Sequence, residues 1–385
     1  RREPASGLES DHVRRRRVTT QGPVPLPQPV RVVGVGLIGG SIGLAAHSRV
    51  PDIGEIVGFD PAPGVAEAAV QLGAIDRAAA TIEEAAQGAE IIVLASPVAT
   101  LVGNAKAALD AAGPEAVVTD VGSTKREIVA AIDDPRFIGG HPIAGAETAG
   151  VEHAREDLFE DSTWFVTPTP NTTGTGLERL MRFTNALGAQ PHAVDAADHD
   201  RLLADISHLP HVLANALVTQ AAGTIKAEDG RVTVVGPSFR DATRVAGANS
   251  SIWRDIYLSN HDALVPAIDS VINSLAEFRD ALKEGDGDRI VELNERAKTD
   301  RQSLLEQDLV GGEVYELRVS VPNQPGVLAN ITLALGKAGV NIVDMALYPA
   351  ADMRSGAISL WVPGEEAAAK TEALIADLGF PVARA

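Results

Sequence analysis

The stretch Val30–Gly39, VRVVGVGLIG, decides the fold of the first half of the chain. Its apolar beginning predicts a short buried strand, and its end is a G-x-G-x-x-G run made by Gly34, Gly36 and Gly39. In dinucleotide-binding folds the first glycine permits a tight turn, the second lets the backbone approach a pyrophosphate, and the third lets helix and strand pack closely. Because the run follows a predicted strand and opens a predicted helix, its context favours a cofactor loop.

The segments after this loop alternate between strand and helix signals up to residue 196. Further apolar strands are predicted at 55–60, 90–97, 116–123, 163–168 and 191–195, and helices at 39–47, 63–72, 81–87 and 99–112. Near-continuous apolar strands that alternate with helices indicate an α/β fold with a Rossmann-type, doubly wound parallel sheet. We therefore predict a dinucleotide-binding domain over residues 30–196.

The second predicted strand ends in Asp60, where an acidic residue can hydrogen-bond the adenine ribose of the cofactor. A carboxylate there repels a 2′-phosphate, and no arginine follows in residues 61–64, so NAD is favoured over NADP. The alternative is that Asp60 only caps the turn before Pro61. The predicted cofactor-binding residues are Gly34, Gly36, Leu37, Ile38, Gly39, Asp60, Ser96 and Pro97.

Residues 197–310 have a different texture and predict a helical domain. Long helices are expected at 198–223, 241–259, 261–284 and 286–307. Pro210 should kink or locally interrupt the first of them. Wide apolar stripes, such as the one through Leu264, Ile268 and Leu275, need partners to bury them, which favours a domain that dimerises.

The two ends of the chain differ again from the middle. After Gly311-Gly312, strands at 313–321, 341–348 and 356–363, helices at 325–338 and 364–378, and a short last strand predict a βαββαβ domain over residues 311–385. Residues 1–29 hold the basic cluster Arg14–Arg17 and a proline-rich stretch, and predict a disordered arm.

Composition narrows the classes of function. A formal net charge of −19 over 385 residues argues against a nucleic-acid partner, which would call for a basic face. The absence of cysteine excludes disulfides and thiol nucleophiles and fits a reducing cytoplasm. No apolar run approaches the roughly 20 residues that a spanning helix needs. The first residues also lack the apolar stretch of a secretory signal. We expect a cytoplasmic protein without a membrane partner.

A dehydrogenase needs a group that takes the hydroxyl proton as hydride leaves, and histidine suits this because its pKa lies near working pH. Of nine histidines, four are candidates: His141 in GGHPIAG (139–145), His199, and His208 and His211 in SHLPH (207–211). The glycines beside His141 would allow close approach of cofactor or substrate, in what we expect to be a loop. His208 and His211 lack a third ligand nearby in sequence, so no metal site is predicted.

Four separated motifs together resemble one known family. GGHPIAG, with DVGS (120–123) before it and SHLPH (207–211) and DATRVA (241–246) after it, is similar to the prephenate dehydrogenase family over roughly residues 30–308. The resemblance implies a Rossmann domain, a helical dimerisation domain and NAD-dependent oxidative decarboxylation in tyrosine biosynthesis. The substrate would be prephenate, giving 4-hydroxyphenylpyruvate, or alternatively arogenate, giving tyrosine.

The resemblance also implies site residues. His141 corresponds to the catalytic histidine, and Ser123 to a serine that helps orient it, although Ser123 could instead cap a helix, where Thr124 and Glu127 also fit a capping box. Arg244 would grip a carboxylate of the dianionic substrate, with a surface salt bridge as the alternative. His208 is the weaker candidate of its pair, and Trp253 could equally be core packing. The implied substrate-binding residues are His211, Arg244, Ser207, Glu147 and Trp253.

The C-terminal unit, with PNQPGVLA (322–329) and GVNIVDM (339–345), resembles an ACT domain. Such domains commonly bind amino acids, so Asn323, Gly326 and Asn341 are effector-binding candidates, and tyrosine is the expected effector.

Two other interpretations remain. A β-hydroxyacid dehydrogenase would use a lysine on a helix of the second domain, and Lys226, near a predicted turn, is poorly placed for this role. A non-catalytic NAD and amino-acid sensor would need no proton acceptor, so His141, His211 and Arg244 together argue against it.

Overall fold

The computed structural model describes residues 26, 28–145, 148–227, 235–307, 314–322, 324, 326–350 and 354–384. Almost all of the predicted N-terminal arm and the Gly311-Gly312 linker lie outside these residues. The chain divides into two compact units, Arg1–Asp229 with Thr243–Ile268, and Gly230–Ala242 with Asp269–Ala385. The limits of the four segments expected from the sequence stay predictions.

The first unit is built on a sheet that has eight strands within the described residues, in the order β3-β2-β1-β4-β5-β6-β7-β8. Neighbouring strands pair in parallel, except β6 and β7, which are antiparallel. The predicted Rossmann-type sheet is confirmed, with this one reversal. The strands are β1 (Val30–Val33), β2 (Val57–Phe59), β3 (Arg77–Ala78), β4 (Ile91–Leu94), β5 (Val117–Asp120), β6 (Phe137–Pro142), β7 (Thr163–Thr167) and β8 (Gln190–Ala193).

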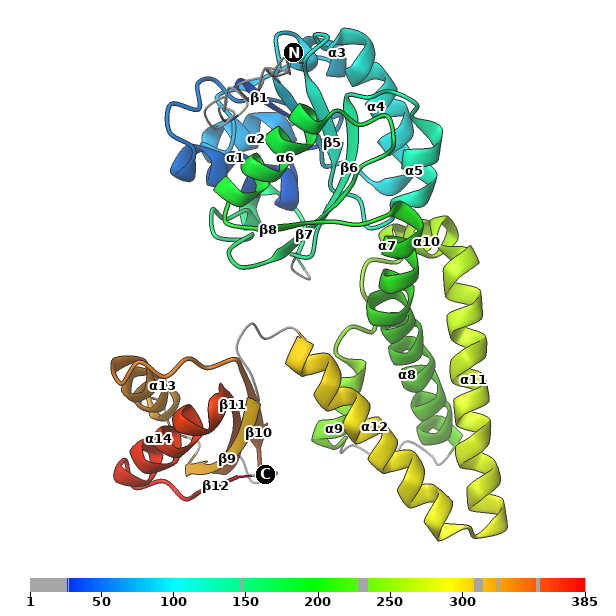
Figure 1. The fold of residues 1–385 in the computed structure, drawn as a ribbon, viewed down its shortest axis with the longest axis vertical. Coiled ribbons are helices and arrows are strands. Elements are labelled where there is room, and N and C mark those ends of the chain that lie inside the picture. The colour runs from blue at the N-terminus through cyan, green and yellow to red at the C-terminus, as the bar shows by residue number, and fades with distance from the viewer. Residues whose placement is uncertain are drawn as a thin grey trace, which may run out of the picture. The chain divides into compact units, whose positions relative to one another are not determined.

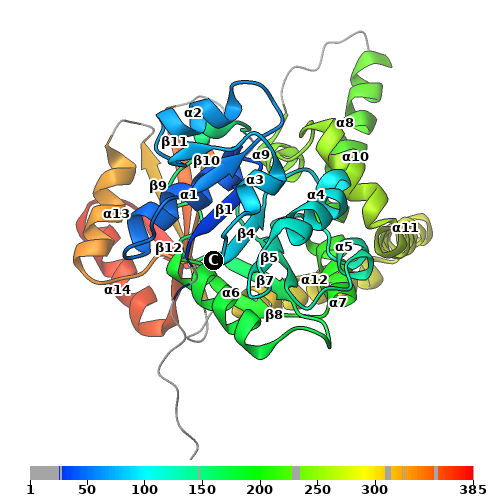
Figure 2. The same ribbon diagram turned by 90° about the horizontal axis from the view of Figure 1, so that it is seen from above.

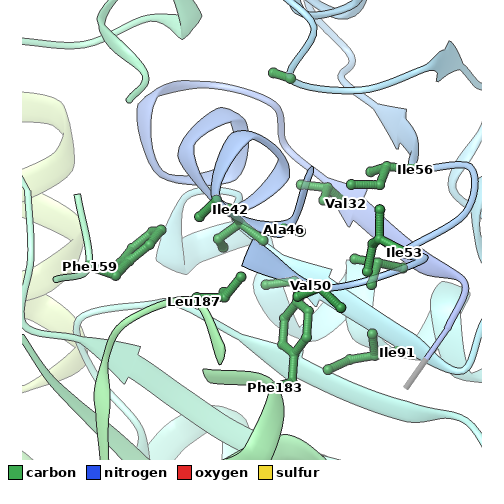
Figure 3. Close-up of a cluster of buried hydrophobic side chains, with 14 of the residues drawn as sticks. Val32, Ile42, Ala46, Val50, Ile53, Ile56, Ile91, Phe159, Phe183 and Leu187 are labelled. Carbon is green, nitrogen blue, oxygen red and sulfur yellow. The ribbon is translucent and has the colours of Figure 1, made fainter. Parts of the chain in front are cut away.

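Helices cover both faces of the sheet (Figure 1). Because successive strand side chains point to opposite faces, Val32 belongs to one apolar layer and Val33 to the other. Figure 3 shows part of the first layer, where Val32 belongs to the same buried cluster as Ile42 and Phe183 from two helices. The helices of the first layer are α1 (Leu37–Arg49), α2 (Val65–Gln71) and α6 (Gly174–Ala186), and those of the second are α3 (Ile82–Ala86), α4 (Val98–Ala111) and α5 (Arg126–Ala131).

A widened helical turn follows the sheet. Helix α7 (Ala196–Leu203) leads through a π-helical turn, Ala204–His208, into α8 (Leu209–Ala227). The N–H of Leu209 donates to the carbonyl oxygen of Ala204, five residues back. Pro210 lacks an N–H and its ring would clash with the carbonyl four residues back in an α-helix, so the wider turn accommodates it. The predicted local interruption at Pro210 is confirmed.

The single helix predicted over 241–259 is wrong. Helix α9 (Pro237–Thr243) ends before Arg244, and α10 (Ser250–Ser259) starts afresh. Gly247 has a φ of +83°, which a helix does not permit. The side chain of Asn249 accepts a hydrogen bond from the N–H of Ser251 at 3.1 Å and caps α10. Arg244 therefore lies in a turn.

Two long helices and a small sheet follow. Helices α11 (His261–Glu284) and α12 (Gly287–Gln307) match the predicted ranges. The small sheet has the order β10-β11-β9-β12, and its pairings are antiparallel. Its elements are β9 (Val314–Pro322), α13 (Val327–Lys337), β10 (Asp344–Pro349), β11 (Ser355–Pro363), α14 (Gly364–Asp377) and β12 (Val382–Arg384), which confirms the βαββαβ prediction.

Helices α13 and α14 lie side by side against one face of this small sheet (Figure 2). Leu317, Ile331 and Ile375, from a strand and the two helices, are fully buried between them. Within the described ranges, no helix is long and apolar enough to cross a membrane.

Candidate active site

The glycine run joins β1 to α1 as predicted, and a different steric requirement applies at each of its three glycines. Gly34 has a φ of +89°, and an added Cβ would lie 2.6 Å from the carbonyl oxygen of Ala95. A Cβ on Gly39 would lie 1.9 Å from the carbonyl oxygen of Gly34. Gly36 precedes the first turn of α1, and a Cβ there would meet no heavy atom within 4 Å. The helix N-terminus thus borders open space, which suits a pyrophosphate.

The carboxylate of Asp60 lies against this loop. Its Oδ2 accepts a hydrogen bond from the N–H of Val35 at 3.1 Å, and its Oδ1 accepts one from the N–H of Ala62 at 2.9 Å. Asp60 therefore caps the turn after β2, as the alternative had it, and also braces the glycine loop. Each carboxylate oxygen keeps capacity for a further hydrogen bond, so a ribose hydroxyl could still bind.

The neighbouring strand end completes the cofactor crevice. The order of the sheet reverses between β1 and β4, which is where open α/β sheets bind their ligands. Ser96 and Pro97 follow β4 there, and the Asn104 side-chain amide donates to the Oγ of Ser96 at 2.8 Å. Leu37 and Ile38 open α1. The residues present fit a dinucleotide.

His141 lies in strand β6, not in the loop expected from the sequence, and is paired with Phe165 of β7. It is buried, and its Nδ1 lies 2.9 Å from the Nε2 of His199. The Nδ1 of His199 lies 2.8 Å from the Oδ1 of Asp200. These three side chains form a buried row, which we call the His141–His199–Asp200 row.

The side chain of Asp200, in α7, also caps the N-terminus of helix α5. It accepts hydrogen bonds from the N–H groups of Lys125 and Arg126 at 2.8 and 2.9 Å. The capping box of Thr124 and Glu127 considered from the sequence is therefore wrong, because Thr124 hydrogen-bonds Ser259 at 2.9 Å instead.

Ser123 lies in the loop between β5 and α5. Among the described residues, the hydrogen-bond partner of the His141 Nδ1 is His199, not Ser123.

A buried ion pair supports the same region. The Lys125 ammonium pairs with Asp120, and both side chains are fully buried. Asp120 also accepts hydrogen bonds from the N–H groups of Gly122 at 2.8 Å and Gly140 at 3.1 Å. The second of these ties the backbone immediately before His141 to the end of β5.

Burial and neighbouring charges keep His141 neutral. Burial lowers the pKa of His141 well below its usual value, and nearby His199, Lys125 and His208 lower it further. For Asp200, burial acts to raise the pKa, but hydrogen bonds from His199 and from the two backbone N–H groups outweigh it and lower the pKa. The row therefore links a neutral His141 to an ionised Asp200 through the ring of His199.

An open cleft of about 890 Å³ lies beside His141. Ser207, His211, Arg244 and Trp253 also line it, so four of the five predicted substrate-binding residues border one space with His141. The fifth, Glu147, lies outside the described residues. The rings of His211 and Trp253 are stacked with centroids 3.5 Å apart. Burial lowers the pKa of His211, and Arg244 adds to this.

His208 has a different environment from His211. It is buried, and its Nδ1 lies 3.0 Å from the side-chain nitrogen of Asn260. Burial lowers the pKa of His208 to about 4. It is absent from the residues that line the cleft, which agrees with its weaker standing as a candidate.

Comparison with known proteins names the family. Residues 44–192 match the family model for the prephenate dehydrogenase nucleotide-binding domain, and residues 195–295 the model for the prephenate dehydrogenase dimerization domain. A prephenate dehydrogenase from Bacillus subtilis is 33% identical over 325 residues, which cover 83% of this chain and 87% of that protein. The chain belongs to the prephenate dehydrogenase family. Residues 315–362 also match the ACT domain model.

Solved structures of this family have the same fold. Prephenate dehydrogenase from Aquifex aeolicus, in complex with hydroxyphenyl propionate and NAD+, matches with a TM-score of 0.68 at 32% identity, over 72% of this chain and 98% of that one. Arogenate dehydrogenase from Synechocystis matches with a TM-score of 0.62 at 28% identity, over 72% of this chain and 99% of that one.

Sequence analysis missed several residues that shape this prephenate dehydrogenase site. The sequence marks His199 as one of four candidate histidines without giving it a role, and it assigns none to Asp120, Lys125 or Asp200. A signal did exist in the triplet Asp198-His199-Asp200, which sets a histidine between two carboxylates. Its link to His141 spans 58 residues and could not be read from local sequence.

The predicted effector residues are spread over the ACT domain. Gly326 precedes α13 with a φ of +88°, Asn341 is exposed before β10, and Asn323 lies outside the described residues. A cavity of about 360 Å³ is lined by Gln324, Leu328 and Tyr348 among others, but neither Gly326 nor Asn341 belongs to its lining.

Proposed function

We propose that this enzyme is an NAD-dependent prephenate dehydrogenase. It converts prephenate and NAD+ into 4-hydroxyphenylpyruvate, carbon dioxide and NADH. The observation that carries the proposal is a neutral, buried His141 beside a cleft that also holds Arg244 and His211. A dianionic substrate with one hydroxyl to oxidise fits this combination of a proton acceptor and anion-binding groups.

The side chains would act in sequence. The glycine loop of Gly34, Gly36 and Gly39 would hold NAD+, whose nicotinamide would take the hydride from C4 of the substrate. His141 accepts the proton of the C4 hydroxyl as that hydride leaves. The C1 carboxylate then departs as carbon dioxide, and His141 returns the proton to the phenolate oxygen, so the proton balance closes. Arg244 holds a carboxylate bidentately, and the stacked ring of Trp253 keeps His211 in place beside it.

The cleft favours prephenate over arogenate. The two substrates differ in a pyruvyl or an alanyl side chain, and the ammonium of the alanyl group would call for a negatively charged partner. Within the described part of the lining, the ionisable side chains are His141, His211 and Arg244. These groups suit a keto acid, whereas the carboxylate of Glu147, an implied substrate-binding residue outside the described residues, would suit the ammonium group of arogenate.

The direct test is NADH formation at 340 nm with prephenate and with arogenate, each with NAD+ and NADP+. We expect turnover with prephenate and NAD+. His141→Asn should lower kcat by roughly 10²–10⁴ while NAD+ affinity stays unchanged. Turnover with arogenate alone would reverse the substrate preference, and no turnover with either substrate would reject the proposed function.

We also propose that the enzyme acts as a homodimer. Helix α11 carries Val265, Ile272, Leu275 and Leu282 on one face, and each is more than half exposed in the single chain. The match to a dimerization domain supports pairing through such a face. Light scattering should give a dimer, and Leu275→Asp should weaken it. Ser274→Asp, which adds the same charge to the same helix off this face, is the control.

Tyrosine is the proposed effector of the ACT domain, and the cavity beside Tyr348 gives it a place of suitable size. Calorimetry of the intact protein with tyrosine, phenylalanine and tryptophan tests this, and no heat with any of them would reject it. The cysteine-free sequence supports work in the reducing cytoplasm.

A further inference from the structure

The inner end of the His141–His199–Asp200 row fixes its hydrogen-bond directions. Asp200 already accepts two backbone N–H groups, at 2.8 and 2.9 Å. An ionised carboxylate has no proton to donate. The Nδ1 of His199, 2.8 Å from Asp200, must therefore carry the hydrogen and donate it.

The remaining positions follow one after the other. With that as its one ring proton, His199 presents its lone pair at Nε2. The Nδ1 of His141, 2.9 Å away, must donate to that lone pair. His141 is neutral, so its second nitrogen, Nε2, is left without a proton. The opposite tautomer would carry a proton on Nε2 and could not accept another from a substrate.

We propose that His199 and Asp200 are positioning residues that hold His141 in the tautomer whose Nε2 accepts the substrate's hydroxyl proton. The identity of that hydroxyl rests on the proposed function. In this step the substrate O–H bond breaks and an N–H bond forms at Nε2 of His141, which becomes an imidazolium.

The charges around His141 act on such a cation in opposite directions. The buried ammonium of Lys125 disfavours it, and the paired carboxylate of Asp120 offsets part of that charge. The carboxylate of Asp200 then remains to stabilise positive charge, transmitted through the ring of His199. His208, the other ionisable group that acts on His141, is neutral near pH 7 because burial lowers its pKa to about 4.

Two amide substitutions at His199 separate its two hydrogen bonds. In His199→Gln the side-chain oxygen reaches the position of Nε2 and can still accept from His141. In His199→Asn the shorter amide reaches the position of Nδ1 and can still donate to Asp200, but it offers His141 no acceptor. The two variants carry the same amide group and differ only in which of the two hydrogen bonds of His199 is kept.

The measurements are kcat, KM for prephenate, NAD+ affinity and the melting temperature of the full-length enzyme. We expect His199→Asn to lower kcat by roughly 10² or more, in the range of a lost or misoriented general base, with KM and NAD+ affinity unchanged. His199→Gln should stay within roughly 10-fold of wild type, because the hydrogen bond that sets the tautomer survives.

Nitrogen NMR of histidine-labelled enzyme reads the tautomer directly and needs no substrate. Wild type and His199→Gln should show His141 protonated at Nδ1, and His199→Asn should show a mixture of both tautomers. Wild-type kcat in a folded His199→Asn variant would overturn the proposal, as would protonation of His141 at Nε2 in the resting wild-type enzyme. If prephenate is not turned over, the resting spectrum still decides the tautomer, so the two failures are distinguishable.

Discussion

Alanine at Gly36 and at Gly39 should damage the enzyme in different ways, although the two glycines are three residues apart. A Cβ on Gly39 would lie 1.9 Å from the carbonyl oxygen of Gly34, whereas real Cβ contacts are essentially never under 3.0 Å. The turn between β1 and α1 would have to open by about 1 Å, and both of its sides are backbone. A Cβ on Gly36 meets nothing within 4 Å, so Gly36→Ala should fold normally.

The sizes of the two effects follow from packing. Overpacking costs about 1–3 kcal/mol, and a backbone neighbour that cannot rotate away places Gly39→Ala at the upper end of that range. A loss of about 3 kcal/mol lowers the melting temperature of a domain this size by roughly 6–12 °C. In Gly36→Ala the same crowding arises only when a pyrophosphate arrives, so NAD+ affinity should fall roughly 5- to 150-fold.

Circular dichroism melting of the cofactor-free proteins and calorimetric titration with NAD+ measure the two effects separately. Gly36→Ala should melt within about 2 °C of wild type and bind NAD+ weakly. If Gly36→Ala binds NAD+ as tightly as wild type, the cofactor does not approach this loop. An unchanged melting temperature in Gly39→Ala would refute the packing argument.

Three further results are expected. Arg244→Gln should raise KM for prephenate roughly 10- to 150-fold, the worth of a hydrogen bond to a charged group, in the 340 nm assay; an unchanged KM would exclude a carboxylate contact. Because the neutral form of His141 accepts the proton and burial lowers its pKa, kcat/KM should fall with acid only below about pH 6.5. The folded-state pKa of His208 is depressed to about 4, so the unfolded chain takes up its proton first as pH falls from 6.5. This should cost about 3 kcal/mol of unfolding free energy by pH 4, and urea titrations should show a shallower loss in His208→Asn, which keeps the acceptor for Asn260.

Local signals in the sequence predicted most of the scaffold. The glycine run, the apolar strands of the parallel sheet and the βαββαβ pattern depend on neighbours a few residues away, so they could be read directly. Of the strand at Phe137–Pro142, only Phe137 and Ile138 look strand-like in the sequence, because Gly139, Gly140 and Pro142 look like turn residues. In the structure these glycines allow close packing: a Cβ on Gly140 would lie 2.6 Å from the carbonyl oxygen of Asp120.

The candidate site was predicted only in part for the same reason. His141, His211 and Arg244 belong to motifs, so they could be named, and the cleft brings them together. The partners of His141 come from contacts across long stretches of chain, such as that between Asp200 and Lys125, 75 residues apart. The turn that carries Arg244 was read as helix because the effects of Gly247 and Asn249 depend on backbone conformation.

The π-helical turn at Ala204–His208 has a consequence for changes in chain length. It holds one residue more than an α-helical turn would, and each residue of an α-helix turns the following chain by about 100°. Deleting one residue there would join α7 and α8 in α-helical register, with a kink left at Pro210. Ser207 and His211 would then rotate away from their places beside His141. Such a deletion should therefore leave most of the helical content unchanged but remove Ser207 and His211 from the cleft. A design that transfers this segment to another protein has to keep the extra residue.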